Sequence, residues 1–202
     1  MCLTATTTVQ AQEVHAEFCV DFRVNSIIVD SAFHDNGLRI AEMLSAIEEM
    51  NSDSLLVLQE VMFCGSASPE GPIALNKRLA TKRMKTLEQI VRLQFSIPDS
   101  IVTYDDRYIP WDYLEKEVKA SDFKHKDEVL QILDNEELVS GYHHSSDHHD
   151  HRIELIKAID GGSVWRELNE RYFKRMRNAC VVLFYYKRVP VASAEKVLVD
   201  TT

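Results

Sequence analysis

The sequence lacks the features that mark several common classes of protein. No run in its 202 residues approaches the roughly 20 apolar residues of a membrane-spanning helix. Its four cysteines form no CxxC pair, so the usual sequence sign of a structural zinc or thioredoxin-like redox site is missing. No P-loop, dinucleotide-binding fingerprint or nucleophile elbow occurs. We therefore expect a protein that is not an enzyme and needs no cofactor.

An excess of basic residues is also missing. The chain has 23 Lys and Arg against 32 Asp and Glu, and its net charge of -9 argues against generic nucleic-acid binding. With 45% hydrophobic residues it has the composition of a folded chain of one domain, or one domain with an appendage. A chain of this length needs no disulfides to build a core. Three cysteines in apolar, β-rich runs are interpreted as small buried side chains: Cys19, Cys64 and Cys180.

Charge is distributed unevenly along the chain. Residues 77–92 hold six basic residues and one acid, a charge of +5, so the remainder carries -14. Residues 99–160 alone carry -9. Four basic residues of the first window are interpreted as a solvated helix face, with contact to a polyanion as the alternative: Lys77, Arg78, Lys82 and Lys85.

The hydrophobic pattern predicts alternating strands and helices. Period-two or continuous apolar runs predict strands at 18–24, 55–64, 101–104 and 179–187. Helical spacing predicts helices at 38–50, 73–94, 111–120, 126–138, 153–159 and 164–176. This order predicts an α+β two-layer sandwich, with helices on one face of a mixed sheet and an acidic helical insert, residues 99–160, before the last strand. Core packing, with a partner-docking stripe as the alternative, is expected of Trp111, Tyr113, Trp165, Tyr172 and Phe173.

The two ends of the chain differ from the predicted domain at 17–188. Residues 1–12 contain no charged side chain, and Val9-Gln10-Ala11 has the small-x-small pattern that precedes a signal-peptidase cut. We interpret this segment as the remnant of an export signal or as a disordered terminus. Residues 189–202 form a C-terminal tail.

One loop and the helix after it contain the clearest functional pattern. Residues 65–72 include two glycines and two prolines, which favour a loop. In the following helix, Asn76, Leu79, Arg83 and Leu87 share one face. An arginine on a face that should be buried must snorkel, pair with an acid or meet a ligand. Free N–H groups at the helix start favour an anion, so a small-anion site and an internal salt bridge are both open.

The segment from Gly65 to Gly71, followed by Asn76, Leu79, Ala80 and Arg83, resembles the core motif of the OmpA-like peptidoglycan-binding domain. The resemblance covers residues 17–95 and 177–188. It implies a βαβαβ-type fold and noncovalent binding of the peptidoglycan stem peptide in a Gram-negative cell envelope. The location implied is the periplasm or the outer membrane, with peptidoglycan or an envelope protein as partner.

The resemblance also implies residue roles. Arg83 would pair with a carboxylate of diaminopimelate, and Asn76 would order the pocket. The family's Asp, which receives the ammonium group of diaminopimelate, falls on Ser68, and a hydroxyl cannot give that charge-assisted bond. Either Glu70 reaches in instead, or the domain is a protein-interaction module on the same fold. The predicted ligand-binding residues are Arg83, Asn76, Ser68, Glu70, Gly65 and Gly71.

Five of the eight histidines lie within residues 143–151. Imidazoles and carboxylates can bind zinc, copper or nickel, and His144 and His148 could converge if the segment curls. The segment has no fixed metal-binding motif, and polar loops often collect histidine without function. Adventitious binding and a plain exposed loop therefore stand beside a specific site, and a metal-dependent enzyme is a third functional hypothesis.

Overall fold

A computed structural model describes residues 10–105, 108–135 and 150–189 of the chain. Its sheet has the strand order β1-β4-β2-β3. Strands β1 and β2 both run antiparallel to β4, and β3 runs parallel to β2, so the sheet is mixed, as predicted. The strands are β1 (Gln10–Asp21), β2 (Leu56–Gly65), β3 (Val102–Asp105) and β4 (Asn178–Val189).

The helices follow the predicted order closely. Two of them, α2 (Ile73–Gln94) and α3 (Trp111–Ala120), have the predicted bounds. Short 3-10 helices at Asp99–Ile101, Ile159–Gly162 and Phe173–Met176 connect other elements. The α-helices of the described residues are α1 (Asn36–Ser52), α2 (Ile73–Gln94), α3 (Trp111–Ala120), α4 (Lys126–Leu133), α6 (His151–Ala158) and α7 (Ser163–Arg171).

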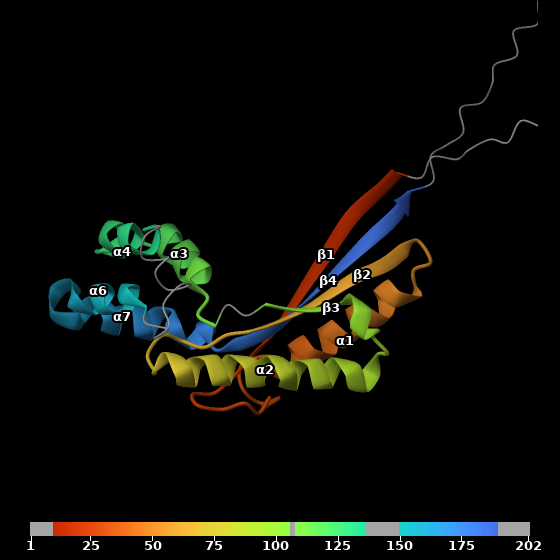
Figure 1. Ribbon diagram of the computed structural model, residues 1–202, viewed down its shortest axis with the longest axis horizontal. Helices are drawn as coiled ribbons and strands as arrows, with labels where there is room; N and C mark the ends of the chain where they lie inside the picture. Colours follow the sequence, from red (N-terminus) through yellow and green to blue (C-terminus); the bar gives the residue numbers. More distant parts are fainter. Residues whose placement is uncertain (1–9, 106–107, 136–149, 190–202) are drawn as a thin grey trace, which may run out of the picture.

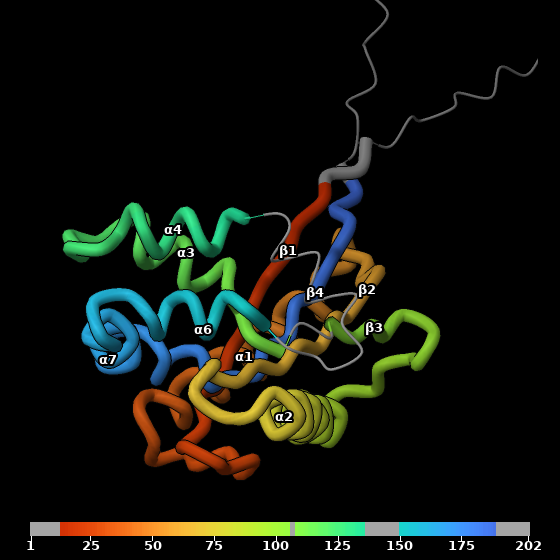
Figure 2. Tube along the Cα trace, turned by 60° about the vertical axis from the view of Figure 1, so that its left-hand side comes forward, coloured from red at the N-terminus to blue at the C-terminus, as the bar shows by residue number. Residues whose placement is uncertain are grey.

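Helices α1 and α2 lie together on one face of the sheet (Figures 1 and 2). Alternate residues of the strands point toward these helices because successive side chains of a strand face opposite sides. The resulting core confirms the predicted two-layer arrangement with helices on one face. Its buried members include Val20, Val61, Phe63, Val181 and Leu183 from the strands, and Met43, Ile47, Leu87 and Val91 from the helices.

The first strand differs from its prediction at both ends. β1 begins at Gln10, inside the segment assigned to the terminus, and ends at Asp21 rather than at residue 24. Phe22 is buried, but Val24 is 71% exposed. The alternation of apolar residues stops because the chain turns away there, with Asn25 in the left-handed region at φ 53°.

Helices α3, α4, α6 and α7 form a helical lobe beyond the end of the sheet at which β2 ends and β4 begins (Figures 1 and 2). The lobe does not coincide with the predicted insert, residues 99–160, because β3 belongs to the sheet and α7 follows residue 160. The lobe has a hydrophobic core of its own, and Trp111, Tyr172 and Phe173 are buried in it, as predicted. Trp165 and Tyr113 pack partly against the same core. None of the helices described is both long enough and apolar enough to cross a membrane.

The interpretation of Cys19 and Cys180 simply as small buried side chains missed a covalent bond between them. These two residues are register partners on β1 and β4, and a disulfide joins them. Cys64 is half-buried on β2, opposite Cys180. The apolar runs around the cysteines indicated strands, but the sequence contains no information on the register that places the cysteines side by side.

Candidate functional site

The predicted loop lies where β2 ends and β4 begins. These strands are antiparallel, so the end of one and the start of the other share an edge of the sheet. The backbone N–H of Ser66 donates to the carbonyl of Asn178 at 2.9 Å, and the Ser66 hydroxyl donates to the carbonyl of Met176 at 2.7 Å. The loop is therefore attached to the segment that enters the last strand.

The two glycines of the motif have different surroundings. A Cβ at Gly65 would lie 2.2 Å from the carbonyl oxygen of Ala80, so glycine is required for the close approach of α2 to β2. Gly71 accepts a hydrogen bond from the Asn76 side chain at 3.1 Å, and Asn76 is 4% exposed. Asn76 thus fixes the end of the loop.

A pocket of about 210 Å³ brings the predicted ligand-binding residues together, with the exception of Gly65. Gly65 contributes through packing and does not line this pocket. The residues that matter for its chemistry are Ser68, Glu70, Gly71, Asn76, Arg83 and Arg177.

Arg83 is the most deeply buried cation of the pocket, at 1% exposure. Its Nε donates to the carbonyl of Ser26 at 3.0 Å, Nη1 to that of Ser66 at 2.8 Å and Nη2 to that of Arg23 at 3.3 Å. Its guanidinium also lies 5.2 Å from the centre of the Phe22 ring. A guanidinium has five N–H groups, so two remain for another acceptor.

No carboxylate of the described residues forms an ion pair with Arg83. Burial and, to a smaller extent, the positive charge of Arg177 together lower the pKa of its guanidinium to about 10. The internal salt bridge considered from the sequence is therefore not the reason for its burial. A buried charge without a counter-ion is costly, and a bound anion would offset that cost.

Arg177 was not predicted from the sequence. It is 8% exposed, its Nε donates to the Ser68 hydroxyl at 3.1 Å, and its Nη2 donates to Oε2 of Glu70 at 3.2 Å. Glu70 is thus paired with an arginine and does not stand alone as an acceptor for an ammonium group. The sequence signal for this position was that Arg177 lies two residues before the last predicted strand, at 179–187.

The charges of the pocket do not balance. Arg83 and Arg177 bring two positive charges, and Glu70 brings one negative charge. A serine occupies the position at which the resemblance expects a second carboxylate. The pocket therefore has donors for a carboxylate and a surplus positive charge that favours one.

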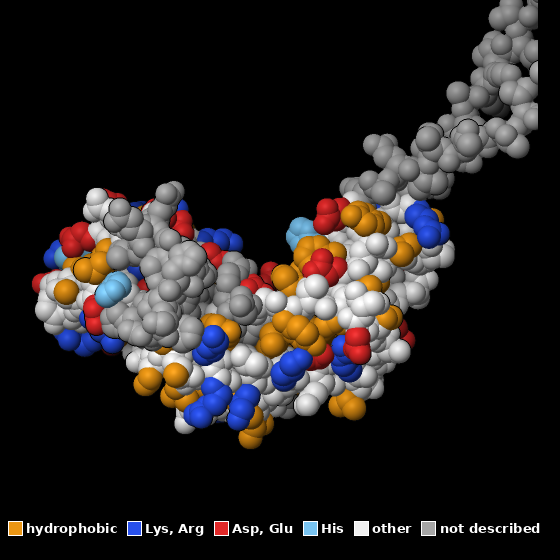
Figure 3. Space-filling view, viewed as in Figure 1, with side chains coloured by type: hydrophobic (Ala, Val, Ile, Leu, Met, Phe, Trp, Pro, Cys, Tyr) orange, Lys and Arg blue, Asp and Glu red, His pale blue; other side chains and the backbone are white. Residues whose placement is uncertain are grey.

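The other basic residues of α2 lie on an outer face. Figure 3 shows Lys and Arg side chains gathered along the edge of the molecule that α2 forms. Lys85 and Arg92 pair with Glu88 at 2.8 and 2.9 Å, and Tyr104 donates to the same carboxylate at 2.8 Å. Burial raises the pKa of Glu88, but these hydrogen bonds outweigh burial, and the net pKa is lowered. Part of the basic window is therefore neutralised within the helix.

The metal candidates His144 and His148 lie outside the described residues. Within the described part of the chain, Glu17, Cys19 and Cys180 have potential ligand atoms within 4.8 Å of one another. The two sulfurs of this group are joined in the disulfide and are not thiolate ligands. We assign no metal site to this group.

None of the protein-family models matches the chain, and no curated protein matches it in sequence. Among solved structures, the OmpA-like domain of FopA1 from Francisella tularensis subsp. tularensis SCHU S4 is similar to it. The similarity covers 93% of this chain and 86% of that one, at 10% identity and a TM-score of 0.42. Agreement at this level does not by itself establish a common family or a common function.

Proposed function

We propose that this chain is a nonenzymatic domain that binds a carboxylate of the peptidoglycan stem peptide between Arg83 and Arg177. The observation that carries the proposal is Arg83, a cation at 1% exposure that lines a pocket and has no acidic partner among the described residues. A guanidinium matches a carboxylate with two parallel N–H donors, and Arg83 has two N–H groups left after its bonds to carbonyls.

The surrounding residues would hold this cation in place for the ligand. The carbonyls of Arg23, Ser26 and Ser66 fix the guanidinium, which reduces the side-chain entropy lost on binding. Asn76 fixes the loop through Gly71. The resemblance of residues 65–83 to the OmpA-like motif supports diaminopimelate as the source of the carboxylate.

The disulfide supports a location in the cell envelope. Disulfides persist in oxidising compartments such as the bacterial periplasm and are rare in the cytosol. Cys19 and Cys180 are joined although the chain has two hydrophobic cores to stabilise it. The disulfide thus supports the periplasm or the outer membrane as the proposed location of the domain.

Sedimentation with purified peptidoglycan tests the proposal. The wild type should co-sediment, and Arg83→Met should lose at least about tenfold in affinity, since one hydrogen-bonded charge pair contributes about 1.5–3 kcal/mol. Arg78→Met is the matched control, because Arg78 is an exposed arginine of the same helix. Equal sedimentation of wild type and Arg83→Met would show that Arg83 does not bind the ligand.

Ser68→Asp tests whether the missing carboxylate limits affinity. The new carboxylate would lie beside Arg177, remove the surplus positive charge and offer an acceptor for an ammonium group. We expect tighter binding of diaminopimelate and weaker binding of pimelate, which has the same two carboxylates and no amino groups. An unchanged preference between the two would contradict this role for position 68.

A protein-interaction module is the second candidate. It is favoured by one observation, that Arg177 holds Glu70, so that no carboxylate of the pocket's described lining is left unpaired for the ammonium group of diaminopimelate. The helical lobe, with its own core, would then present the partner surface. A wild-type chain that binds pimelate but does not sediment with peptidoglycan would favour this candidate.

A further inference from the structure

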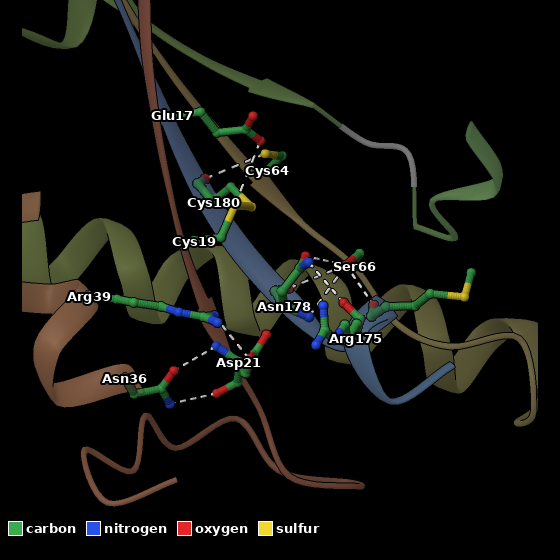
Figure 4. Close-up of a disulfide and its surroundings, with 11 residues drawn as sticks. Glu17, Cys19, Asp21, Asn36, Arg39, Cys64, Ser66, Arg175, Asn178 and Cys180 are labelled. Carbon is green, nitrogen blue, oxygen red and sulfur yellow. Dashed lines mark hydrogen bonds and ion pairs between the residues drawn. A yellow bond between two sulfur atoms is a disulfide. The ribbon is translucent and has the colours of Figure 1, made fainter. Parts of the chain in front are cut away.

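A second and larger cavity, of about 550 Å³, lies apart from the anion pocket, and the two share no lining residue. Three cysteines line it: Cys19, Cys64 and Cys180. Figure 4 shows their side chains next to one another, with the carboxylate of Glu17 close by. Figure 3 shows the surface hollowed between the helical lobe and the outer end of the sheet.

The sheet places the three cysteines in one row. Cys180 on β4 is the register partner of Cys19 on β1 and also of Cys64 on β2. Register partners on neighbouring strands point to the same face, so all three sulfurs lie on one side of the sheet. The Cys64 thiol lies 3.5 Å from the carbonyl oxygen of Cys180.

We propose that these three cysteines form a thiol–disulfide exchange centre. The thiolate of Cys64 attacks Sγ of Cys180, a Cys64–Cys180 bond forms, and the Cys180–Cys19 bond breaks. Cys19 leaves as a thiolate and takes up the proton that Cys64 lost. The number of disulfides is unchanged, so the step needs no oxidant or reductant.

The strand order provides the geometry for this attack. A thiolate approaches a disulfide sulfur from the side opposite to the leaving sulfur. Because β4 lies between β1 and β2, Cys19 and Cys64 lie on opposite sides of Cys180. Oε1 of Glu17 lies 3.7 Å from Sγ of Cys19, so the Cys19 thiol can donate a hydrogen bond to this carboxylate once the departing sulfur has taken up a proton.

The exchange changes which strand is tied to β4. In one state the bond holds β1, an edge strand whose neighbour in the sheet is β4. In the other state the bond holds β2, and β1 is retained by hydrogen bonds and packing alone. The Cys19 thiol then faces the cavity. Arg83 and Arg177 take no part, so this proposal does not depend on anion binding.

Thiol labelling of the full chain tests the exchange. A Cys2→Ser background leaves the three cysteines of the row, and N-ethylmaleimide near pH 8 followed by acid quenching and nonreducing peptide mapping locates labels and disulfides. We expect a Cys64–Cys180 peptide, together with Cys19 labelled at least about tenfold above its level in a Cys64→Ser control, which has no attacking thiol. The proposal would be overturned if N-ethylmaleimide labelled Cys64 while the labelling of Cys19 stayed at the level of the control.

Cys19→Ser tests whether the second pair can close. With oxidised glutathione we expect a Cys64–Cys180 disulfide within about twofold of the yield of Cys19–Cys180 in Cys64→Ser. A yield that does not change on dilution would identify the bond as internal. Glutathione adducts on Cys64 and Cys180 without an internal bond would show that the two sulfurs cannot meet, and the proposal would be wrong.

Discussion

The two most deeply buried arginines of the described residues, Arg83 and Arg152, lie in different parts of this molecule, and their partners differ. Arg152, in the helical lobe, is 4% exposed and lies against Asp150, which is 1% exposed. Its Nε and Nη2 donate to the two carboxylate oxygens at 2.9 and 2.8 Å, and the indole N–H of Trp111 donates to Oδ2 at 2.8 Å. Arg83, on helix α2 beside the sheet, donates hydrogen bonds to three backbone carbonyls and feels the positive charge of Arg177.

The comparison shows that burial of an arginine does not by itself mark a binding site. The charge of Arg152 is satisfied inside the protein, and no ligand is needed to explain it. The Arg83 guanidinium lines a pocket and donates hydrogen bonds to backbone carbonyls, but no described residue neutralises its charge. The lack of a counter-ion among the described residues is the feature that distinguishes Arg83 from Arg152, and the proposed anion site rests on it.

The largest effect should come from breaking the paired site. Asp150→Asn removes the buried carboxylate to which Nε and Nη2 of Arg152 donate, and we expect the free energy of unfolding in urea to fall by about 3–5 kcal/mol. Asp122→Asn is the control, because Asp122 pairs with Arg171 while its side chain is 95% exposed, and a change below about 1 kcal/mol is expected. Equal effects of the two substitutions would contradict the assignment of Arg152 as a structural arginine.

A smaller loss of stability is expected at Arg83. Arg83→Met removes a positive charge and leaves no unpaired acid behind among the described residues. The backbone carbonyls that accept hydrogen bonds from Arg83 lose their donor. Without ligand, the free energy of unfolding should fall by about 1–3 kcal/mol, less than for Asp150→Asn. A loss as large as that of Asp150→Asn in urea titrations would mean that Arg83 has an acidic partner in the folded chain.

A bound carboxylate should distinguish the two arginines directly. At a concentration tenfold above its Kd, pimelate should raise the free energy of unfolding of the wild type by about 1.4 kcal/mol, which thermal unfolding detects as a higher Tm. The Arg83→Met variant should show no such shift. Stabilisation of both proteins to the same extent would place the anion elsewhere.

The smallest effect concerns Glu88, whose carboxylate pairs with Lys85 and Arg92. Its pKa is lowered in the folded state, so the stabilisation is present above the unfolded pKa of about 4.3 and is lost as the pH falls through the folded value. Glu88→Gln should lower stability at pH 7 by about 1 kcal/mol and flatten the acid limb of the stability curve. Urea unfolding curves at pH 7 and pH 3 measure this effect. The prediction would be contradicted if the stability lost between pH 7 and pH 3 were the same in Glu88→Gln as in the wild type.

Residue patterns within one element were enough to predict much of this structure. The steps of three and four between Asn76, Leu79, Arg83 and Leu87 predicted the buried face of α2 and the burial of Arg83. That prediction depends on the period of a single helix, which the local sequence contains. The start of β1 was harder, because residues 10–17 mix polar and apolar side chains along an edge strand.

Features that depend on register between distant strands were not predictable from local pattern. Arg177 reaches Ser68 across more than a hundred residues because β2 and β4 share an edge. The same register places Cys180 between Cys19 and Cys64. Spacing along the chain contains neither relation, since strand pairing is determined by the packing of the whole sheet.

Calorimetric titration of pimelate into the ligand-free protein tests the role of Arg83 most directly. We expect saturable binding to the wild type and to Arg78→Met, and a loss of at least about tenfold in affinity for Arg83→Met, because the two exposures differ while the residue type and the helix are the same. No binding to the wild type, or equal binding to all three proteins, would contradict an anion site at Arg83.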